Sequence, residues 1–430
     1  MPDLSAEILS LLETPRLEAL PWDDDQMPPH YHGLGLVNIP ATVCRLLDVP
    51  ALGEYPPLDE RLTAPLGAAR RVILLVMDGM RWDLLKQALE AGLLPGWARL
   101  AERGVLAPLT SIAPSTTASA LTTLWTGAAP AEHGITGYEV WLREYALVAN
   151  MIYHQPTSFR RGMDDLRKSG FQPETFVPQP TMGEHLAQFG VRTLAFQHYT
   201  ISHSGLSQML FREADVRAFS TPAQLWFNVR QALTEPAHEK QYFWVYWGPV
   251  DGLQHHYGPR DPRVLAELHA FGWALERYLL DALTPDERQE TVLLITADHG
   301  HIHTDDNPDF YLRHHPRLQE TFHIPPCGEN RLMYLYPRAG YAEAMLDYFA
   351  NQWPDAFTLV PSTDALEAGL LGTAPQRHPE IMPRVGDWMA LARGAAYLWW
   401  DDKPNHLIGR HGGLSRAEML VPLLAARLDE

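Results

Sequence analysis

The amino-acid sequence predicts an α/β protein in which helices cover both faces of a buried central sheet. Two observations support this fold class. From residue 71 onward, apolar runs of strand length alternate with amphipathic runs of helix length, which is the pattern of a sheet with helices on its faces. The strand-like runs, such as RVILLVM and TVLLIT, are apolar or β-branched at nearly every position, and runs of that kind suit strands that are buried on both faces.

The expected elements of the core follow one another in a regular order. The clearest strands are 71–79, 191–197, 242–248 and 291–300, and the clearest helical segments are 81–92 and 264–283. The second helical segment carries a good apolar stripe, which indicates packing against the core rather than a cofactor site.

Three regions of the sequence differ in composition and hydrophobic pattern, and these differences suggest a domain organisation. Residues 1–70 form a Pro-rich N-terminal extension that opens with a short amphipathic helix pattern. Residues 71–304 and 394–430 carry the alternating elements and are expected to form the α/β core. Residues 305–393 are irregular and rich in Pro, His and charge, so we expect an inserted cap. The cap still contains a strand-like RLMYLY and a helix-like YAEAMLDYFANQW.

The bulk composition limits the kind of function. The 430 residues are 46% hydrophobic and 20% charged, and this length can bury one large core beside an inserted domain. The 34 Lys and Arg residues against 52 Asp and Glu residues give a net charge of −18. That balance argues against a nucleic-acid duplex as partner, because such binding needs Lys and Arg to replace the counterions of the phosphates.

Cysteine usage and the N-terminus point to a reduced, cytoplasmic protein. Cys44 and Cys327 lie far apart in unrelated sequence, so we expect neither a disulfide framework nor a thiolate metal site. The first twenty residues lack the basic start and continuous apolar run of a signal peptide, and no later segment reads as a membrane span.

Three strand-like runs end close to an acidic residue. Asp78 follows RVILLVM, Asp251 follows YFWVYWGPV and Asp298 follows TVLLITA. A single acid at such a place is most simply a helix cap or a turn residue. In open α/β sheets, however, ligands bind in the crevice beyond the carboxyl ends of the strands. Because histidines accompany these three acids, we expect them to converge on a binding site.

Histidines with suitable spacing complete a set of metal ligands. Asp251 and His255 lie four residues apart, so a helical turn places them on one face. Asp298 and His299 are adjacent, and His411 lies in the glycine-rich GRHGGLS. Three carboxylates and three imidazoles suit zinc, with manganese or iron as alternatives. Six ligands are too many for one tetrahedral site and would fill most of two.

The segment APSTTASALTTLWTGAAPAEHG at 113–134 supplies candidate hydroxyl groups. Its Ser and Thr residues precede a helix-compatible run, and a helix N-terminus favours an anion. For Ser115 and Thr116 we expect simple helix capping. Thr117 is the candidate for another role, because a metal can activate a weak hydroxyl nucleophile.

Five segments in this order resemble the alkaline phosphatase superfamily and, within it, the nucleotide pyrophosphatase/phosphodiesterase-like branch. The matching segments are VILLVMDGMRWD, PSTTASALTTLWTGAAPAEHGI, PVDGLQHHYGP, ITADHG and GRHGGLS. They extend from residue 72 to residue 413, so the resemblance leaves out the first seventy residues. It implies a three-layer sandwich with a mostly parallel central sheet flanked by helices and with a cap inserted before the last metal histidine.

The resemblance also implies a reaction and a role for each residue. The reaction is two-step phosphoryl transfer, in which Thr117 forms a covalent phospho-threonine and a phosphodiester or pyrophosphate bond is cleaved. The substrate is then a small phosphate ester such as a nucleotide, and the cofactors are two divalent ions, with zinc expected. The residues that match the ligands of one ion are Asp78, Thr117, Asp298 and His299, and those that match the ligands of the other are Asp251, His255 and His411.

The sequence departs from the family at one position that affects the substrate. Many members carry an Asn shortly after the HGI motif, where it donates a hydrogen bond to a phosphate oxygen. In HGITGYEVW that place is taken by Tyr138, whose phenol can still donate but with a different reach. Arg81, Arg160 and Arg161 are candidate substitutes for this contact, although Arg81 is expected to pair with nearby acids and the other two to be solvated.

Other reactions stay open on the same site. A phosphomonoesterase, a phosphonate hydrolase similar to phosphonoacetate hydrolase, or a phosphotransferase to an acceptor other than water would use the same ligands. Sulfatases need a Cys or Ser followed by Pro and Arg, which TTASA lacks, and cofactor-independent phosphoglycerate mutases use Ser. An inactive binding protein would have lost ligands that this chain retains. No feature of the sequence indicates an oligomeric state.

Overall fold

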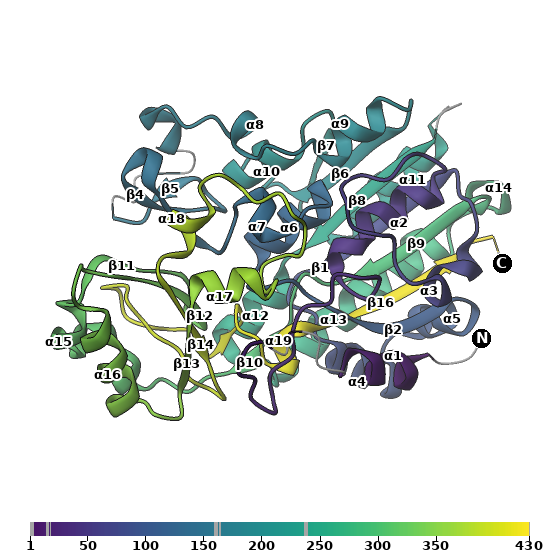
Figure 1. Cartoon of the computed structure of the whole chain (residues 1–430). Helices are drawn as coiled ribbons and strands as arrows, with labels where there is room; N and C mark the ends of the chain where they lie inside the picture. Colours follow the sequence, from purple (N-terminus) through teal and green to yellow (C-terminus); the bar gives the residue numbers. More distant parts are fainter. Residues whose placement is uncertain are drawn as a thin grey trace.

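The computed structural model describes residues 4–13, 17, 19–158, 162, 165–235 and 240–429. At its centre lies a seven-stranded, mixed and mostly parallel sheet (Figure 1) in which only one strand, between Leu420 and Arg427, runs against its described neighbours. The predicted α/β class is therefore confirmed. The strand order is β2 (Val105–Thr110), β16 (Leu420–Arg427), β9 (Thr291–Thr296), β1 (Arg71–Met77), β8 (Gln241–Trp247), β6 (Arg192–His198) and β7 (Asp215–Phe219).

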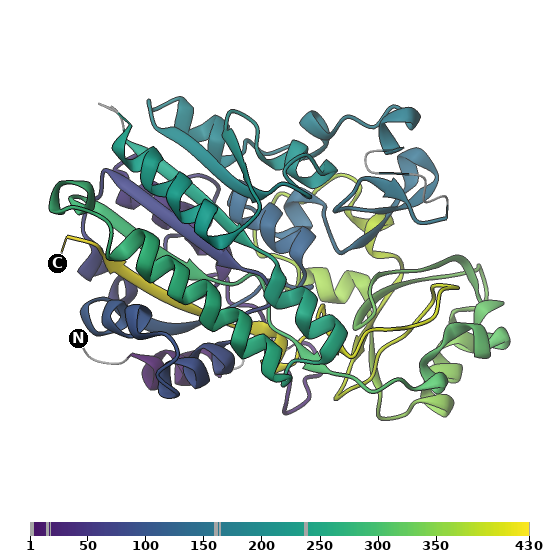
Figure 2. The same ribbon diagram turned by 180° about the vertical axis from the view of Figure 1, so that it is seen from behind.

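Helices pack against both faces of this sheet. α13 (Pro262–Leu275) buries Val264, Leu268, Phe271 and Leu275, and this spacing of three and four residues is the apolar stripe of a helix that faces a core. Figure 2 shows α11 (Pro222–Thr234) and α13 side by side across one face. The other members of the two layers are α4 (Trp82–Glu90) and α5 (Pro95–Arg103) beside α13, and α2 (Ile39–Leu46), α6 (Thr117–Thr126) and α9 (Met182–Ala187) on the opposite face.

The N-terminal residues pack as part of this core. α1 (Ser5–Leu12) lies against β2, and α2 contacts α6, so that Ile39 and Val43 are fully buried within the main apolar cluster. The boundary at residue 70 stays a sequence-based prediction. Among the described residues, none of the helices has both the length and the apolarity needed to cross a membrane.

A second seven-stranded sheet lies beside the core, on the left side of Figure 1. RLMYLY and YAEAMLDYFANQW form a strand and a helix, β12 (Leu332–Pro337) and α16 (Ala342–Gln352). The sheet also takes in residues 139–156, whose short strands the apolar pattern did not reveal. The limits of the cap at 305–393 remain a prediction. The remaining strands of this sheet are β13 (Phe357–Pro361), β14 (Trp388–Ala392), β11 (Phe322–Glu329), β3 (Glu139–Leu142), β4 (Leu147–Asn150) and β5 (Gln155–Pro156).

Shorter helices connect these elements and position the residues beyond the strand ends. The most relevant are α12 (Pro249–Tyr257), which directly follows β8, and α19 (Arg416–Met419), which directly precedes β16. The others are α3 (Glu60–Thr63), α7 (Pro130–His133), α8 (Pro173–Phe176), α10 (Gly205–Leu210), α14 (Pro285–Arg288), α15 (Pro316–Gln319), α17 (Ser362–Glu367) and α18 (Ile381–Val385).

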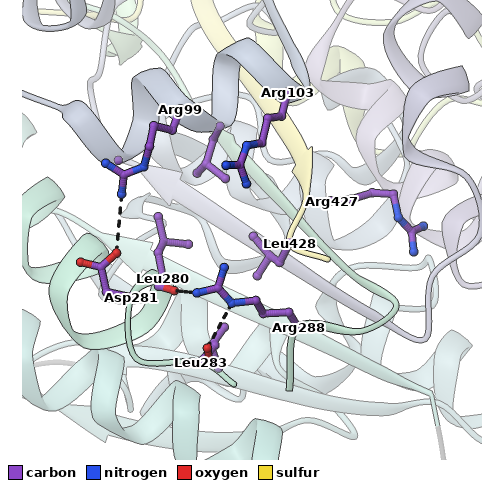
Figure 3. A pocket seen from close by; sticks show the side chains of 10 residues that line it. Arg99, Arg103, Leu280, Asp281, Leu283, Arg288, Arg427 and Leu428 are labelled. Atoms are coloured by element: carbon purple, nitrogen blue, oxygen red, sulfur yellow. Dashed lines mark hydrogen bonds and ion pairs between the residues drawn. The ribbon is translucent and has the colours of Figure 1, made fainter. Parts of the chain in front are cut away.

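A small cavity of about 110 Å³ at the amino edge of the parallel strands is bordered by four arginines (Figure 3). At least three of these arginines bind groups of the protein itself, because Arg427 donates to the carbonyl groups of Leu66 and Ala68 at 2.8 and 2.9 Å. Arg99 pairs with Glu276 at 2.8 Å, and Arg288 donates to the carbonyl groups of Leu280 and Leu283 at 2.5 and 3.1 Å. The bonds from Arg288 satisfy carbonyl groups where a helical segment ends, so we assign Arg288 and the ion-paired Arg99 a structural role.

Candidate metal centre and catalytic cavity

The carboxyl edge of the central sheet brings together the residues predicted for the first metal site. Asp78 follows β1 and Asp298 follows β9, and parallel pairing of these two strands places both acids at one edge. The His299 Nε2 atom lies 3.3 Å from Asp78 Oδ1 and 3.6 Å from Asp298 Oδ2. The Thr117 hydroxyl lies 3.1 Å from the same nitrogen. All four predicted ligands of this site therefore converge.

The residues predicted for the second site lie directly beside the first. Asp251 and His255 occupy one face of α12, with 3.4 Å between Asp251 Oδ1 and His255 Nε2. His411 Nε2 lies 3.8 Å from the same carboxylate oxygen. The rings of His411 and His299 stack at 3.8 Å between centroids, so the two clusters adjoin. Asp251 is close enough to both clusters to contribute an oxygen to either.

His301 belongs to the second cluster although the sequence did not single it out. Its Nε2 atom lies 2.6 Å from Asp251 Oδ1, and its ring lies 4.7 Å from that of His255. The side chain is buried, and its Nδ1 atom has no hydrogen-bond partner among the described residues. The available signal was its position two residues after His299, because residues two apart in extended backbone share a side.

The imidazole rings are oriented by backbone carbonyl groups. In each of three rings the Nδ1 atom lies within hydrogen-bond distance of a carbonyl oxygen. When Nδ1 carries the proton and donates a hydrogen bond to that oxygen, the lone pair of Nε2 is free to bind a metal ion at the centre of the site. The pairs are His255 with Gly409 at 2.8 Å, His299 with Gly300 at 3.0 Å and His411 with Ser115 at 3.2 Å.

Burial and mutual repulsion perturb the acids strongly. Burial raises the pKa of Asp78 well above its usual range, and the charges of Asp251 and Asp298 raise it further. Burial also raises the pKa of Asp298. Burial alone would raise the pKa of Asp251, but the charge of His255 and the hydrogen bond from His301 outweigh it and hold that pKa well below its usual range.

This donor set fits divalent cations. Asp78 Oδ1 and Asp298 Oδ2 are buried without a hydrogen-bond partner among the described residues, and a buried carboxylate oxygen without a partner is costly. Burial also lowers the pKa of His411 well below its usual range and that of His301 to about 3, which keeps imidazole lone pairs available. Carboxylate and imidazole ligands of this kind suit zinc, manganese or iron.

Neighbouring groups hold the carboxylates in place. The Tyr246 hydroxyl donates to Asp78 Oδ2. The backbone N–H groups of Gly79 and His299 donate to Asp298 Oδ1 at 3.1 and 3.0 Å. Such outer partners fix the orientation of metal ligands. Every residue of β8 is buried, Tyr246 included, so the burial pattern of this strand gave no functional signal for Tyr246.

Thr117 is the first residue of α6 and faces the cavity. The capping expected of Ser115 and Thr116 is wrong, because neither hydroxyl caps α6. Ser115 instead donates to the carbonyl of Gly413 at 2.7 Å, and the Thr116 side chain bonds to the carboxyl group of Glu329. Both hydroxyls have partners from distant segments that the sequence could not place near them.

A cavity of about 890 Å³ opens over the two clusters. Leu121 lies one helical turn after Thr117 and begins an apolar wall. Tyr138, the candidate substrate-binding residue, lines the same cavity, and its role in substrate binding stays a prediction. The apolar lining continues with Ile152, Ile201, Leu206, Leu210 and Phe211, and the cavity is also lined by Trp399, Trp400, Lys403, His406 and Arg410.

Of the three arginines considered for phosphate contact, Arg81 alone lies in the described part of the chain. Arg81 is buried, pairs with Asp83 at 2.7 Å and donates to Gln254 Oε1 at 3.3 Å, so it braces α12 as a structural partner. Arg160 and Arg161 lie outside the described residues.

Residues 72–414 match the family described as type I phosphodiesterase / nucleotide pyrophosphatase. The chain belongs to this family. Membership confirms the resemblance carried by the five sequence segments and identifies the chain as a phosphoester hydrolase. Metal dependence is typical of the family.

Solved structures with the same fold include members of two kinds of enzyme. Murine ectonucleotide pyrophosphatase / phosphodiesterase 5 superposes with a TM-score of 0.59 at 17% identity, over 83% of this chain and 87% of that chain. Phosphonoacetate hydrolase from Sinorhizobium meliloti 1021, in complex with phosphonoformate, superposes with a TM-score of 0.60 at 19% identity, over 84% of this chain and 90% of that chain. At these identities the likeness shows the fold alone.

Proposed function

We propose that this chain cleaves phosphodiester or pyrophosphate bonds of small substrates by two-step phosphoryl transfer through Thr117. The observation that carries the proposal is the position of the Thr117 hydroxyl. It lies at the start of a helix, lines the large cavity and is 3.1 Å from Nε2 of His299, a member of the first ligand cluster.

Two divalent cations are proposed as cofactors, with zinc first and manganese or iron as alternatives. When bound, they would lower the pKa of the attacking hydroxyl and neutralise the phosphoryl oxygens during in-line displacement. The residues proposed to hold them are Asp78, Asp298, His299 and the Thr117 oxygen in one site, and Asp251, His255 and His411 in the other, with His301 beside Asp251.

The protein residues perform the two transfers as follows. The Thr117 oxygen forms a bond to phosphorus while the bond to the first alcohol or phosphate breaks, and the product alcohol takes up a proton. Water then attacks the phospho-threonine, restores the Thr117 hydroxyl and releases the phosphate-bearing product. The N-terminal end of α6 favours the negative charge that gathers there.

The solved neighbours support a small phosphorus-containing substrate. One structure of the murine protein is an inactive threonine-to-alanine variant in complex with AMP, and another structure of the Sinorhizobium enzyme contains phosphonoacetate. The first supports a threonine nucleophile and a nucleotide-like product, and the second keeps a phosphonate as the alternative substrate. The large cavity can admit the second ester group of a diester, which favours the diester.

Hydrolysis of three substrates by the metal-loaded enzyme tests this function. We expect bis-p-nitrophenyl phosphate to be cleaved faster than p-nitrophenyl phosphate or phosphonoacetate, and Thr117→Ala to lower kcat roughly 10³-fold or more. Thr122→Ala is the matched control, because its hydroxyl bonds within the same helix to Ala118 and lies away from the cavity. Acid quenching should trap a phosphorylated peptide that contains Thr117.

The outcomes separate the alternatives. Preference for the monoester would favour a phosphatase, and preference for phosphonoacetate would favour a phosphonate hydrolase. Transfer of the phosphoryl group to an added alcohol in place of water would indicate a phosphotransferase. Full activity in Thr117→Ala would overturn the proposed nucleophile.

A further inference from the structure

Glu329, the last residue of β11, brings a carboxyl group from the second sheet to the wall of the catalytic cavity. Its Oε1 atom accepts a hydrogen bond of 2.7 Å from the backbone N–H of Tyr138. The carboxyl group also bonds to the Thr116 side chain. The residue is only 8% exposed, so both bonds are shielded from water.

The stem of Glu329 makes a third contact, with the segment that delivers His411. Gly412 follows His411 and has a φ of +99°, and a Cβ atom built there would lie 2.6 Å from Cβ and Cγ of Glu329. Only a glycine fits in that space. One side chain from the second sheet thus contacts the start of α6, the loop of Tyr138 and the turn of His411.

In the described part of the chain, no cation pairs with Glu329 to explain its burial. Among the described residues no ion pair joins it, its charged neighbours include Glu139 and Glu418, and Arg331 is already paired with Glu418. Burial raises the pKa of Glu329 to about 8. A buried carboxyl group without a cation is costly, so packing alone is a poor reason for an acid at this position.

Thr116 depends on this carboxyl group for its orientation. It is the residue before α6, in extended conformation with φ −143° and ψ 149°, and its side chain makes no capping bond to the helix. The bond to Glu329 therefore holds the side chain of Thr116, and Thr117 is the next residue in the chain. A hydroxyl that attacks phosphorus must be placed accurately, because small misplacements cost large factors in rate.

We propose that Glu329 is a positioning residue for phosphoryl transfer, which sets the Thr117 hydroxyl and Tyr138 in one arrangement over the ligand clusters. The inference rests on the proposed function, because it takes Thr117 as the attacking group. Through Glu329, the second sheet acts on the nucleophile without touching the reacting atoms.

Two variants test the proposal: Glu329→Ala should lose the positioning bonds, and the conservative Glu329→Gln should keep them. The glutamine oxygen can accept from Tyr138 N–H and its amide can donate to the Thr116 hydroxyl, so Gln should keep kcat within about 3-fold of the parent. Ala should lower kcat about 10- to 100-fold, with a smaller change in KM and an unchanged metal content. The matched control is Glu276→Ala, since Glu276 also accepts from a backbone N–H, that of Gly96 at 3.0 Å, far from the cavity.

Thr116→Val provides a second route if Glu329→Ala does not fold. It removes the hydroxyl that Glu329 holds and keeps a similar shape, and kcat should fall by a similar factor. The double variant Thr116→Val/Glu329→Ala should be no slower than the slower single variant, because both changes break the same bond.

The results distinguish this inference from the proposed function. A parent enzyme that leaves both p-nitrophenyl esters and phosphonoacetate intact would refute the proposed function and the positioning role with it. A parent enzyme that depends on Thr117, together with Glu329→Ala at parental kcat, would overturn the positioning role alone. Loss of metal or of folding in Glu329→Gln as well as in Thr116→Val would also overturn it, because a merely structural role predicts that result.

Discussion

Replacing Arg331 by Met should reveal how the structure holds the turn that carries His411. Arg331 and Glu418 are both fully buried and form two hydrogen bonds, of 2.7 and 3.0 Å. Glu418 also accepts a bond of 2.8 Å from the N–H of Gly413, two residues after His411. Met fills a similar volume but leaves the carboxylate without its cation.

The expected loss of stability depends on the hydrogen bonds that Glu418 keeps when Arg331 is replaced. Removing one partner of a buried ion pair costs about 3–5 kcal/mol. Glu418 would retain the bonds from Gly413 N–H and from the N–H and hydroxyl of Ser415, so we expect a value in the lower part of that range, about 3 kcal/mol.

The pH dependence of this loss gives the sharper test. Burial alone would raise the pKa of Glu418, but in the parent protein Arg331 holds this pKa below its usual range. The ionised Glu418 therefore stabilises the parent protein above the ordinary glutamate pKa. This stabilisation is lost as the pH falls through the depressed pKa. Without Arg331, burial should raise that pKa, and stability should then be lost as the pH rises through the raised value. The difference between the two proteins should therefore grow from acid to neutral pH.

Urea unfolding of the parent and of Arg331→Met at several pH values measures this difference. The control is Arg143→Met, because Arg143 is mostly exposed, at 62%, and Glu380 is partly exposed, at 26%, so this pair should contribute at most about 1 kcal/mol. A loss below 1 kcal/mol in Arg331→Met, or a loss that does not change with pH, would refute the idea that an uncompensated buried charge causes it.

Three further predictions concern the metal centre and a buried acid. A chelator should lower the thermal midpoint of unfolding and abolish activity. Zinc or manganese added at about 100 times its Kd should restore roughly 2.7 kcal/mol of unfolding free energy per site. Equal midpoints with and without chelator would contradict a cation site at Asp78 and Asp251. Tyr246→Phe removes the hydroxyl that donates to Asp78 and should weaken metal affinity about 10- to 100-fold in a competitive chelator titration, so unchanged affinity would speak against that support. Burial raises the pKa of Glu132 from 4.5 to about 7, so its contribution to the free energy of unfolding is present below about pH 4.5 and is lost as the pH rises through 7, by roughly 3 kcal/mol. Glu132→Gln should flatten the pH dependence of stability in this window, and equal slopes in both proteins would show that Glu132 is not its source.

The sequence predicted those parts of the fold whose physical cause is local. Strands β1 and β9 are buried on both faces and must be apolar at almost every position, so their pattern is visible in the chain. The strands between residues 139 and 156 are short and only partly buried, and their pattern carries no such signal. Their place beside β11 depends on the pairing of Glu139 with Gly328, which no local pattern encodes.

The sequence by itself also determined which residues end the strands and which share a helical face. Asp78 and Asp298 meet because their parallel strands end at one edge, and Asp251 and His255 meet because they are four residues apart in a helix. Tertiary structure alone decided that His301 lies against Asp251, 50 residues away, and that Glu329 bonds to Tyr138, 191 residues away. Contacts at such separations follow from how layers pack, because a side chain from one sheet finds a partner only after the other sheet has been placed beside it.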